Sequence, residues 1–344
     1  MTGPPPVAVL VSDCHFSLEP PSARADRNWL QTQHEHLFES LVAADGSSVP
    51  LVIAGDVFDT WNQPVELVNT LAGTFAGFPG VSVFMVPGQH DLPYHDIRQI
   101  DRAAIHTLML AITATRTKDA VCEIVDGVSR LQSPARDGWL VYGAGWGQPW
   151  GYADRVSPEV HNDEKVLLVA HQYTHAGTPE TQYVGAGVEK SVLTGDMADK
   201  LDGYAAAVFG DNHIPWLATV NGTHREGSNY DLDVYNHGCM VRRKSDERKY
   251  APEYGVLFDD GSIVRHKIEA ANHDQWRDGE CDYTIPDTLH LSLPGGVTAE
   301  FVQSVRQLAT DERVDFSAAI HRLLGEARLS KAAKKEILAL LPDK

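Results

Sequence analysis

The sequence contains few cysteines and no closely spaced pair of them. Its 344 residues include 4 cysteines, and no two of these have the spacing of a CxxC pair. They are Cys14, Cys122, Cys239 and Cys281. This scatter argues against a disulfide framework and against a zinc ribbon. We therefore expect reduced thiols and a reducing compartment.

Long apolar runs and a leader pattern are missing as well. The longest apolar runs, such as Val81–Val86 and Val166–Ala170, have the length of a strand. A membrane-spanning helix needs roughly 20 apolar residues, so we expect no membrane anchor. The first residues, MTGPPPVAVLVSD, lack the basic start and the cleavage site of a signal peptide. We interpret the sequence as that of a mature cytoplasmic protein.

Positive charge is also scarce. The sequence has 29 Lys and Arg against 47 Asp and Glu, which gives a formal net charge of −18. Proteins that coat nucleic acid through charge alone carry a basic surface, so this balance argues against that class. It does not argue against an enzyme that holds a phosphate with metal ions, because bound cations dominate the local field.

Short apolar runs alternate with longer segments of helical spacing, which is typical of an α/β protein with buried strands. We predict helices over Trp29–Ala43 and Val65–Phe75. The predicted strands are Val7–Ser12, Pro50–Ala54, Val81–Val86, Cys122–Val125, Trp139–Ala144, Val166–Ala170, Ala205–Phe209, Tyr254–Phe258 and Ser262–Ile268. The last two flank the turn sequence DDG, which predicts a hairpin.

The composition changes near Ala270, where the sequence becomes polar and rich in turn residues. We therefore predict a catalytic domain over residues 1–270 and a small helical C-terminal subdomain over residues 271–344. The predicted elements of this subdomain are a strand over Leu289–Leu293 and helices over Thr298–Leu308, Phe316–Leu324 and Lys331–Leu341. A packing or capping role is favoured for it, and a surface that covers the active site or binds a partner is the alternative.

Residues that bind metals follow five of the predicted strands. They are Asp13 and His15, then Asp56 and Asp59, then Gln89, His90 and Asp91, then His171, and finally Asp211 and His213. In open α/β sheets, sites form outside the carboxyl ends of the strands, so we expect these side chains to converge. Asp and His are common ligands of Mn²⁺, Fe²⁺ and Zn²⁺, and amide oxygens also serve. A bridging carboxylate such as Asp56 would allow two ions to hold one phosphate.

The order of these motifs resembles that of the calcineurin-like metallophosphoesterases, which is D-x-H, G-D-x-x-D, G-N-H-D, H and G-H-x-H. The matching segments are Asp13–His15, Gly55–Asp59, Gly88–Asp91, His171 and Gly210–His213. Within that superfamily the chain is most similar to the Mre11/SbcD-type DNA nucleases, phage members included. The segments VSDCHFSLEPP, IAGDVFDTW, VPGQHDLPYH and NHGCMVRRKSDE carry that similarity. The resemblance covers roughly residues 7–268.

The resemblance implies a four-layer α/β/β/α sandwich and a role for each matching residue. Asp13, His15, Asp56 and His213 would hold the first metal, and Asp56 would bridge to the second, which Gln89, His171 and Asp211 would complete. His90 would act on the scissile phosphate, either by protonating the leaving oxygen or by stabilising the transition state. Asp91 would orient His90.

The resemblance also implies cofactors, a substrate and partners. Two divalent ions, Mn²⁺ in the first place with Mg²⁺, Fe²⁺ or Zn²⁺ as alternatives, would supply a hydroxide that cleaves a DNA phosphodiester. Such a nuclease would work in DNA repair or DNA replication. A Rad50/SbcC-like ATPase partner and a homodimer are the implied partners.

Two residues depart from the family pattern, and both belong to the second metal. Gln89 stands where the family has Asn, and Asp211 stands where it has His. The second site is then retuned toward Mg²⁺ or Mn²⁺, or binds its metal only with substrate, or is degenerate. The first two interpretations are favoured because the first-metal ligands and His90 are all present.

Three further residues are candidates for substrate binding. Arg242 and Arg243 form a basic cluster with Lys244 that can bind a phosphate backbone or simply lie in an exposed loop. Trp146, in the glycine-rich segment GAGWGQPWG, can stack on a base or pack a turn. Two functions besides a nuclease stay open at this point. One is a phosphoesterase for a small phosphate ester, and the other is a catalytically weak structural or regulatory subunit.

Overall fold

A computed structural model describes residues 3–131, 138–151, 164–177, 192–193, 197–223 and 229–276. The strand and the three helices predicted beyond residue 276 lie outside the described residues, and the predicted border at residue 270 stays a prediction. The described residues all belong to one unit, made of Met1–Tyr183 and Lys190–Glu280. Within them, no helix is both long and apolar enough to cross a membrane.

The first of two large sheets has the strand order β14-β13-β1-β2-β3-β4. Its strands are β1 (Pro6–Val11), β2 (Leu51–Ala54), β3 (Val83–Val86), β4 (Cys122–Ile124), β13 (Glu253–Phe258) and β14 (Ile263–Lys267). Strands β1 to β4 run parallel to one another, while β13 pairs antiparallel with β1 and with β14. The hairpin predicted at DDG is confirmed. Because β1, β2 and β3 are parallel neighbours, their carboxyl ends meet at one edge.

The second sheet has the order β11-β12-β10-β7-β6-β5. Its strands are β5 (Gly127–Arg130), β6 (Trp139–Ala144), β7 (Lys165–His171), β10 (Ala206–Gly210), β11 (Trp216–Thr223) and β12 (Asn229–Asn236). The central strands β6, β7, β10 and β12 are parallel, and the two edge strands are antiparallel. The short strands β8 (Thr174–His175) and β9 (Val192–Leu193) form a separate pair.

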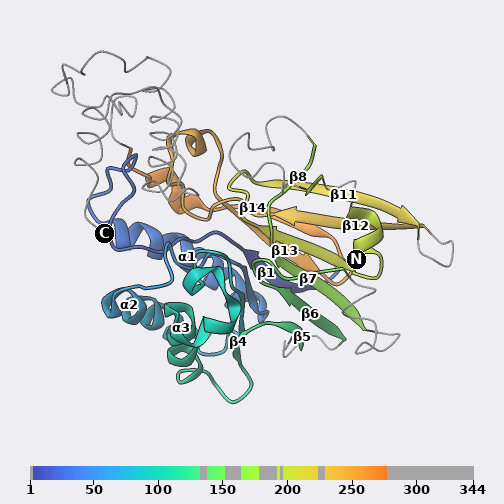
Figure 1. Ribbon diagram of the computed structural model, residues 1–344, viewed down its shortest axis with the longest axis horizontal. Helices are drawn as coiled ribbons and strands as arrows, with labels where there is room; N and C mark the ends of the chain where they lie inside the picture. The colour runs from blue at the N-terminus through green and yellow to red at the C-terminus, as the bar shows by residue number, and fades with distance from the viewer. Residues whose placement is uncertain are drawn as a thin grey trace, which may run out of the picture. The chain divides into compact units, whose positions relative to one another are not determined.

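The first sheet packs against a helical layer on one face and against the second sheet on the other, through side chains that alternate along its strands. Val9 and Val11 of β1 pack with the helices, whereas Ala8 and Leu10 pack with strands of the second sheet. The helices are α1 (Trp29–Ser47), α2 (Val65–Ala76) and α3 (Ala104–Thr113), which gather on one side in Figure 1. The short helix α5 (Ala198–Leu201) joins an apolar cluster with the other face of the second sheet. The predicted α/β sandwich is confirmed.

Several elements were not predicted, namely α3, α5, β5, β8, β9, β11 and β12 and the short helices η1 (Pro93–His95), η2 (Ile97–Arg102), η6 (Ser245–Lys249) and η7 (Glu269–His273). The signal for two of them was present in the sequence. In β11, Trp216 and Val220 face the apolar cluster and the polar Thr219 and Asn221 lie on the other face, and in β12 Leu232 and Val234 alternate with Asp231 and Asp233. A period of two residues is the mark of a strand with one buried face.

Candidate metal centre

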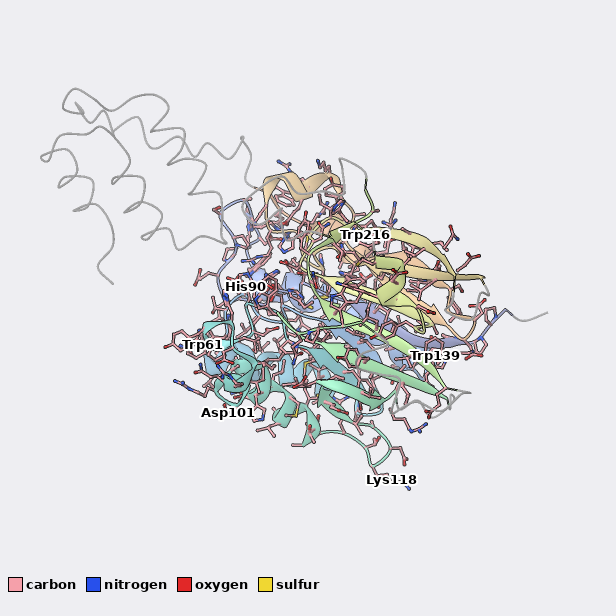
Figure 2. All side chains as sticks on the ribbon, turned by 45° about the vertical axis from the view of Figure 1, so that its right-hand side comes forward. Trp61, His90, Asp101, Lys118, Trp139 and Trp216 are labelled. Carbon is pink, nitrogen blue, oxygen red and sulfur yellow. The ribbon has the colours of Figure 1, made fainter. Side chains whose placement is uncertain are left out.

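The residues that follow the five predicted strands converge. Strands β1, β2 and β3 of the first sheet and β7 and β10 of the second bring them to one place. Among the described residues, four groups of three metal-binding side chains have ligand atoms that all lie within 4.8 Å of one another. The groups are Asp13–His15–His213, His15–Asp56–His90, Asp13–Asp56–His171 and His213–Cys239–Glu247. Figure 2 shows His90 at the opposite end of the strands from Trp139, the first residue of β6.

The backbone turns sharply where it delivers these side chains. Asp13, His15, Asp56 and Asp211 have φ angles of 47°, 46°, 47° and 80°, in the left-handed region that residues other than glycine rarely adopt. This conformation costs about 1–2 kcal/mol for each such residue. Main-chain hydrogen bonds between the loops hold it, for example from Asp13 N to the Gly55 carbonyl at 3.0 Å. Strain of this kind is typical of functional sites.

The first group has the spacing of a metal site. The Nε2 atoms of His15 and His213 lie 3.0 Å apart, and each lies 3.8 Å from Asp13 Oδ1. Asp56 Oδ2 lies 3.7 Å from His15 Nε2. Metal–ligand bonds of about 2.1 Å place neighbouring ligand atoms about 3.0–3.4 Å apart. These four side chains therefore fit one divalent ion with little movement.

Asp56 also faces a second group of acceptors. His171 Nε2 lies 3.4 Å from Asp56 Oδ2, and both atoms are buried without a hydrogen-bond partner among the described residues. His171 Nδ1–H donates to the Ala54 carbonyl at 2.8 Å, which leaves Nε2 as the nitrogen for a cation. Gln89 Oε1 is likewise buried and without a partner. Asp56 Oδ2, His171 Nε2 and Gln89 Oε1 are therefore suitable ligands for a second divalent ion.

Charge is concentrated around the two positions. Burial raises the pKa of Asp13 to about 6. Burial also acts to raise the pKa of Asp56, but the charges of His171 and His90 outweigh it and hold that pKa at about 2. For His171, burial acts to lower the pKa, and the charge of Asp56 outweighs it, so the pKa is raised well above its ordinary value. Without a cation, the buried carboxylates rely on protonated imidazoles, and divalent ions would replace those protons.

His90 is held with one nitrogen toward this cluster. Its Nδ1–H donates to the Asp59 carbonyl at 2.7 Å, and its Nε2 lies 3.9 Å from Asp56 Oδ2. The His90 side chain is 26% exposed, whereas Asp56 is fully buried. Its Nε2 can therefore reach a substrate that lies against the cluster.

Asp91 makes different contacts from the one that the resemblance implies. Its carboxylate accepts main-chain N–H groups of Val57, Phe58 and Gly88 at 3.1, 2.9 and 3.0 Å, whereas the His90 ring bonds to Asp59. Burial, followed by the charge of Asp56, raises the pKa of Asp91 to about 7. Asp91 thus ties the loop after β2 to the loop after β3 and orients His90 only through the backbone.

A model of the calcineurin-like phosphoesterase family matches residues 7–215, which is more than half of the chain. The chain belongs to the calcineurin-like phosphoesterase family. It is therefore a phosphoesterase, and its cluster of Asp and His residues supports metal-dependent hydrolysis of phosphate esters. A comparison with curated proteins found no match.

Glu247 also belongs to this phosphoesterase centre, and the sequence motifs do not predict it. Its Oε1 lies 2.8 Å from His213 Nδ1, and its Oε2 accepts main-chain N–H groups of Arg243 and Lys244 at 2.5 and 2.9 Å. Burial acts to raise the pKa of Glu247, but the hydrogen bond from His213 outweighs it and lowers that pKa to about 2. Glu247 fixes the ring so that Nε2 faces His15. The segment NHGCMVRRKSDE contains this residue, but only the fold brings it to His213.

Replacing Glu247 with glutamine is expected to weaken binding of the first metal by about 10–100-fold. Glutamine keeps the size, but its amide nitrogen must face either the main-chain donors or His213 Nδ1, and it satisfies neither as the carboxylate does. Calorimetric titration of the metal-free protein with Mn²⁺ measures this. Glu66→Gln, at an exposed position of α2, is the matched control. Equal affinity in E247Q and the wild type would show that Glu247 has no part in holding His213.

The three predicted substrate-binding residues lie in different settings. Arg243 is buried, and its Nη1 lies 2.6 Å from Asp59 Oδ1, beside the cluster. Arg242 instead contacts Asp274 and main-chain carbonyls, and its guanidinium lies over the ring of Trp276. The Trp146 ring is half-buried, with its centroid 6.4 Å from that of His171. Substrate binding by these residues stays a prediction.

Gly55 packs directly against His171. Its φ angle is +94°, and a Cβ built on it would lie 1.9 Å from His171 Nδ1. We expect Gly55→Ala to displace the His171 ring, to lower the free energy of unfolding by about 1–3 kcal/mol and to weaken metal binding. Gly73→Ala in α2 is the control, because a Cβ there meets nothing within 4 Å. Thermal melting with and without Mn²⁺ measures both effects, and an unchanged G55A would contradict the packing described here.

Proposed function

We propose that this phosphoesterase is a DNA nuclease of the Mre11/SbcD type that hydrolyses phosphodiester bonds with two divalent ions, Mn²⁺ in the first place. The observation that carries the proposal is the arrangement at the strand ends. Two sets of metal ligands share Asp56, and His90 and Arg243 lie beside them. The similarity of four sequence segments to that branch supports the choice of DNA as the substrate.

The bound ions would neutralise the phosphate and activate water for attack on it. One position would be held by Asp13, His15, Asp56 and His213, and the other by Asp56, His171 and Gln89. His90 contributes a proton. Because Nδ1–H is engaged with the Asp59 carbonyl, Nε2 is the atom that donates to the leaving oxygen.

Arg243 and Trp146 suit the remainder of a nucleotide chain. The Arg243 guanidinium is held beside the cluster by Asp59, and guanidinium groups bind phosphate oxygens through paired N–H donors. The Trp146 ring lies near His171, which is 3.4 Å from Asp56, and bases stack on such rings. These local features offset a net charge of −18, because contacts close to the reacting phosphate matter more than the sum over the chain.

Cleavage of single- and double-stranded DNA with Mn²⁺, with Mg²⁺ or with EDTA tests the proposal, with hydrolysis of bis(4-nitrophenyl) phosphate measured in parallel. We expect both substrates to be cleaved and EDTA to stop both reactions. Hydrolysis of the small ester without any cleavage of DNA would overturn the nuclease proposal in favour of a small-ester phosphodiesterase. Two bound metals with neither reaction would favour a structural or regulatory subunit.

We extend the proposal to a Rad50/SbcC-like ATPase partner and to a homodimer. Both rest on the resemblance to the nuclease branch. Light scattering of the purified chain measures its oligomeric state, and a mass equal to that of one chain would contradict the homodimer. Addition of the candidate ATPase with ATP should increase the cleavage of double-stranded DNA.

A further inference from the structure

Gln89 and Asp211 contact each other across the centre. Gln89 follows β3 of the first sheet and Asp211 follows β10 of the second, and Gln89 Nε2 donates a hydrogen bond of 2.8 Å to Asp211 Oδ1. These are the two positions at which the sequence departs from the motif order of the family. Two departures that touch each other are better explained as one coupled change than as two independent losses.

This hydrogen bond fixes the orientation of the Gln89 amide. A carboxylate only accepts hydrogen bonds, and an amide donates only through its nitrogen. The reversed amide would place its oxygen against Asp211 Oδ1 with no proton between them. Oε1 must therefore point away from Asp211, and it is buried without a hydrogen-bond partner among the described residues. A buried carbonyl oxygen in that state requires an electropositive partner.

Neighbouring groups place the Gln89 side chain beside Asp56 and His171. The backbone beside Gln89 abuts Asp56, because a Cβ on Gly88 would lie 2.0 Å from Asp56 Oδ1. The backbone beside Asp211 abuts His171 in the same way, because a Cβ on Gly210 would lie 2.6 Å from His171 Nδ1. We therefore group Gln89 with Asp56 and His171. Asp56 Oδ2 and His171 Nε2 are, like Gln89 Oε1, buried without a hydrogen-bond partner among the described residues.

The two side chains also compensate for each other in length. Gln89 is one methylene longer than the asparagine of the family pattern, and Asp211 is shorter than the histidine. Asp211 is itself held firmly, since its main-chain N–H donates to both carboxylate oxygens of Asp13 at 3.1 Å. A fixed short acceptor can restrain a longer, otherwise flexible amide, and this restraint is what a metal ligand needs.

We propose that Asp211 is a positioning residue that holds the Gln89 amide with Oε1 toward the second metal, and that the two residues form one compensating pair. The inference rests on the proposed function only in requiring a second divalent ion. An amide oxygen and the Asp56 carboxylate make this position rich in oxygen, which favours hard cations such as Mn²⁺ and Mg²⁺. The second site is then altered in its ligands and is not degenerate.

A double-mutant cycle with Mn²⁺ tests the pair. The variants are Gln89→Asn, Asp211→His and the two combined, and calorimetry with native mass spectrometry gives the stoichiometry and affinity of each. We expect the wild type to bind two Mn²⁺ and each single variant to weaken the second by about 10–100-fold. The double variant should lose less than either single variant. If its loss equals or exceeds the product of the two single losses, the residues act independently and the proposal is overturned.

Two milder variants keep the test decisive if histidine at position 211 prevents folding. Asp211→Asn retains an acceptor oxygen for Gln89, whereas Asp211→Ala removes it. We expect D211N to bind two Mn²⁺ and D211A to bind one, with melting curves of the metal-free proteins showing that both fold. Equal binding by D211N and D211A would overturn the positioning role. A wild type that binds two Mn²⁺ but cleaves no DNA would contradict the nuclease and leave this inference standing.

Discussion

Replacing Asp56 with asparagine is expected to lower phosphodiester hydrolysis by about 10³-fold or more, because the Asp56 carboxylate faces both metal positions. Its Oδ2 lies 3.7 Å from His15 Nε2 and 3.4 Å from His171 Nε2. An amide at this position carries no charge and cannot bridge two cations. D56N should therefore bind at most one Mn²⁺, which native mass spectrometry measures beside the hydrolysis rate.

Asp101→Asn is the matched control for D56N, since Asp101 is an exposed residue of η2 (Figure 2). It should bind metal and hydrolyse substrate like the wild type. If D56N keeps two bound Mn²⁺ and the rate of the wild type, Asp56 does not bridge two metal ions in this centre.

Replacing His90 with alanine is expected to slow DNA cleavage by about 10²–10⁴-fold while leaving metal binding unchanged. The reason is that we assign His90 to proton donation and not to either metal position, and H90A decides between this role and the ligand group His15–Asp56–His90. Hydrolysis of bis(4-nitrophenyl) phosphate should fall much less, because 4-nitrophenolate leaves without needing a proton. Steady-state rates on both substrates, with Mn²⁺ stoichiometry, measure this.

Comparing DNA with the 4-nitrophenyl ester distinguishes two possible roles of His90, proton donation to the leaving oxygen and stabilisation of the transition state. Equal losses on both substrates would contradict proton donation and would favour stabilisation of charge in the transition state. His106→Ala, at a partly exposed position of α3, controls for the loss of an imidazole elsewhere in the chain. A loss of bound Mn²⁺ in H90A would instead show that His90 is a ligand.

The sequence predicted the gathering of the site because each residue lies within a few positions of a strand end. Once Val7–Ser12, Pro50–Ala54 and Val81–Val86 were assigned as strands, parallel pairing placed Asp13, Asp56 and the GQHD segment at one edge. The positions of the strands follow from short hydrophobic runs, and such runs can be recognised from neighbouring residues alone. The individual contacts between these side chains could be identified only from the folded structure.

The contacts that escaped prediction join residues far apart in the chain. Glu247 reaches His213 from η6, and Gln89 reaches Asp211 across the two sheets. Asp91 looked like the partner of its neighbour His90, but three main-chain donors occupy its carboxylate. No spacing rule foretells such pairs, because they depend on how the two sheets are packed against each other.

Arg242 is a further case in which the sequence did not predict the contacts of a side chain. In the sequence it forms one basic cluster with Arg243, yet the two side chains have different partners. Arg243 pairs with Asp59 beside the metal centre, while Arg242 and Arg24 both bind Asp274 and flank the ring of Trp276. Local charge identifies a basic segment, and the direction of each side chain is set by the surrounding fold.

A two-metal centre is tested most directly by a Mn²⁺ titration of the chelator-treated wild-type protein, followed in parallel by calorimetry and by hydrolysis of bis(4-nitrophenyl) phosphate. We expect two bound Mn²⁺ per chain, no hydrolysis without metal, and a rate that rises as the second Mn²⁺ binds. Hydrolysis at full rate by the metal-free protein, or a well-folded protein that binds no Mn²⁺, would contradict a two-metal centre.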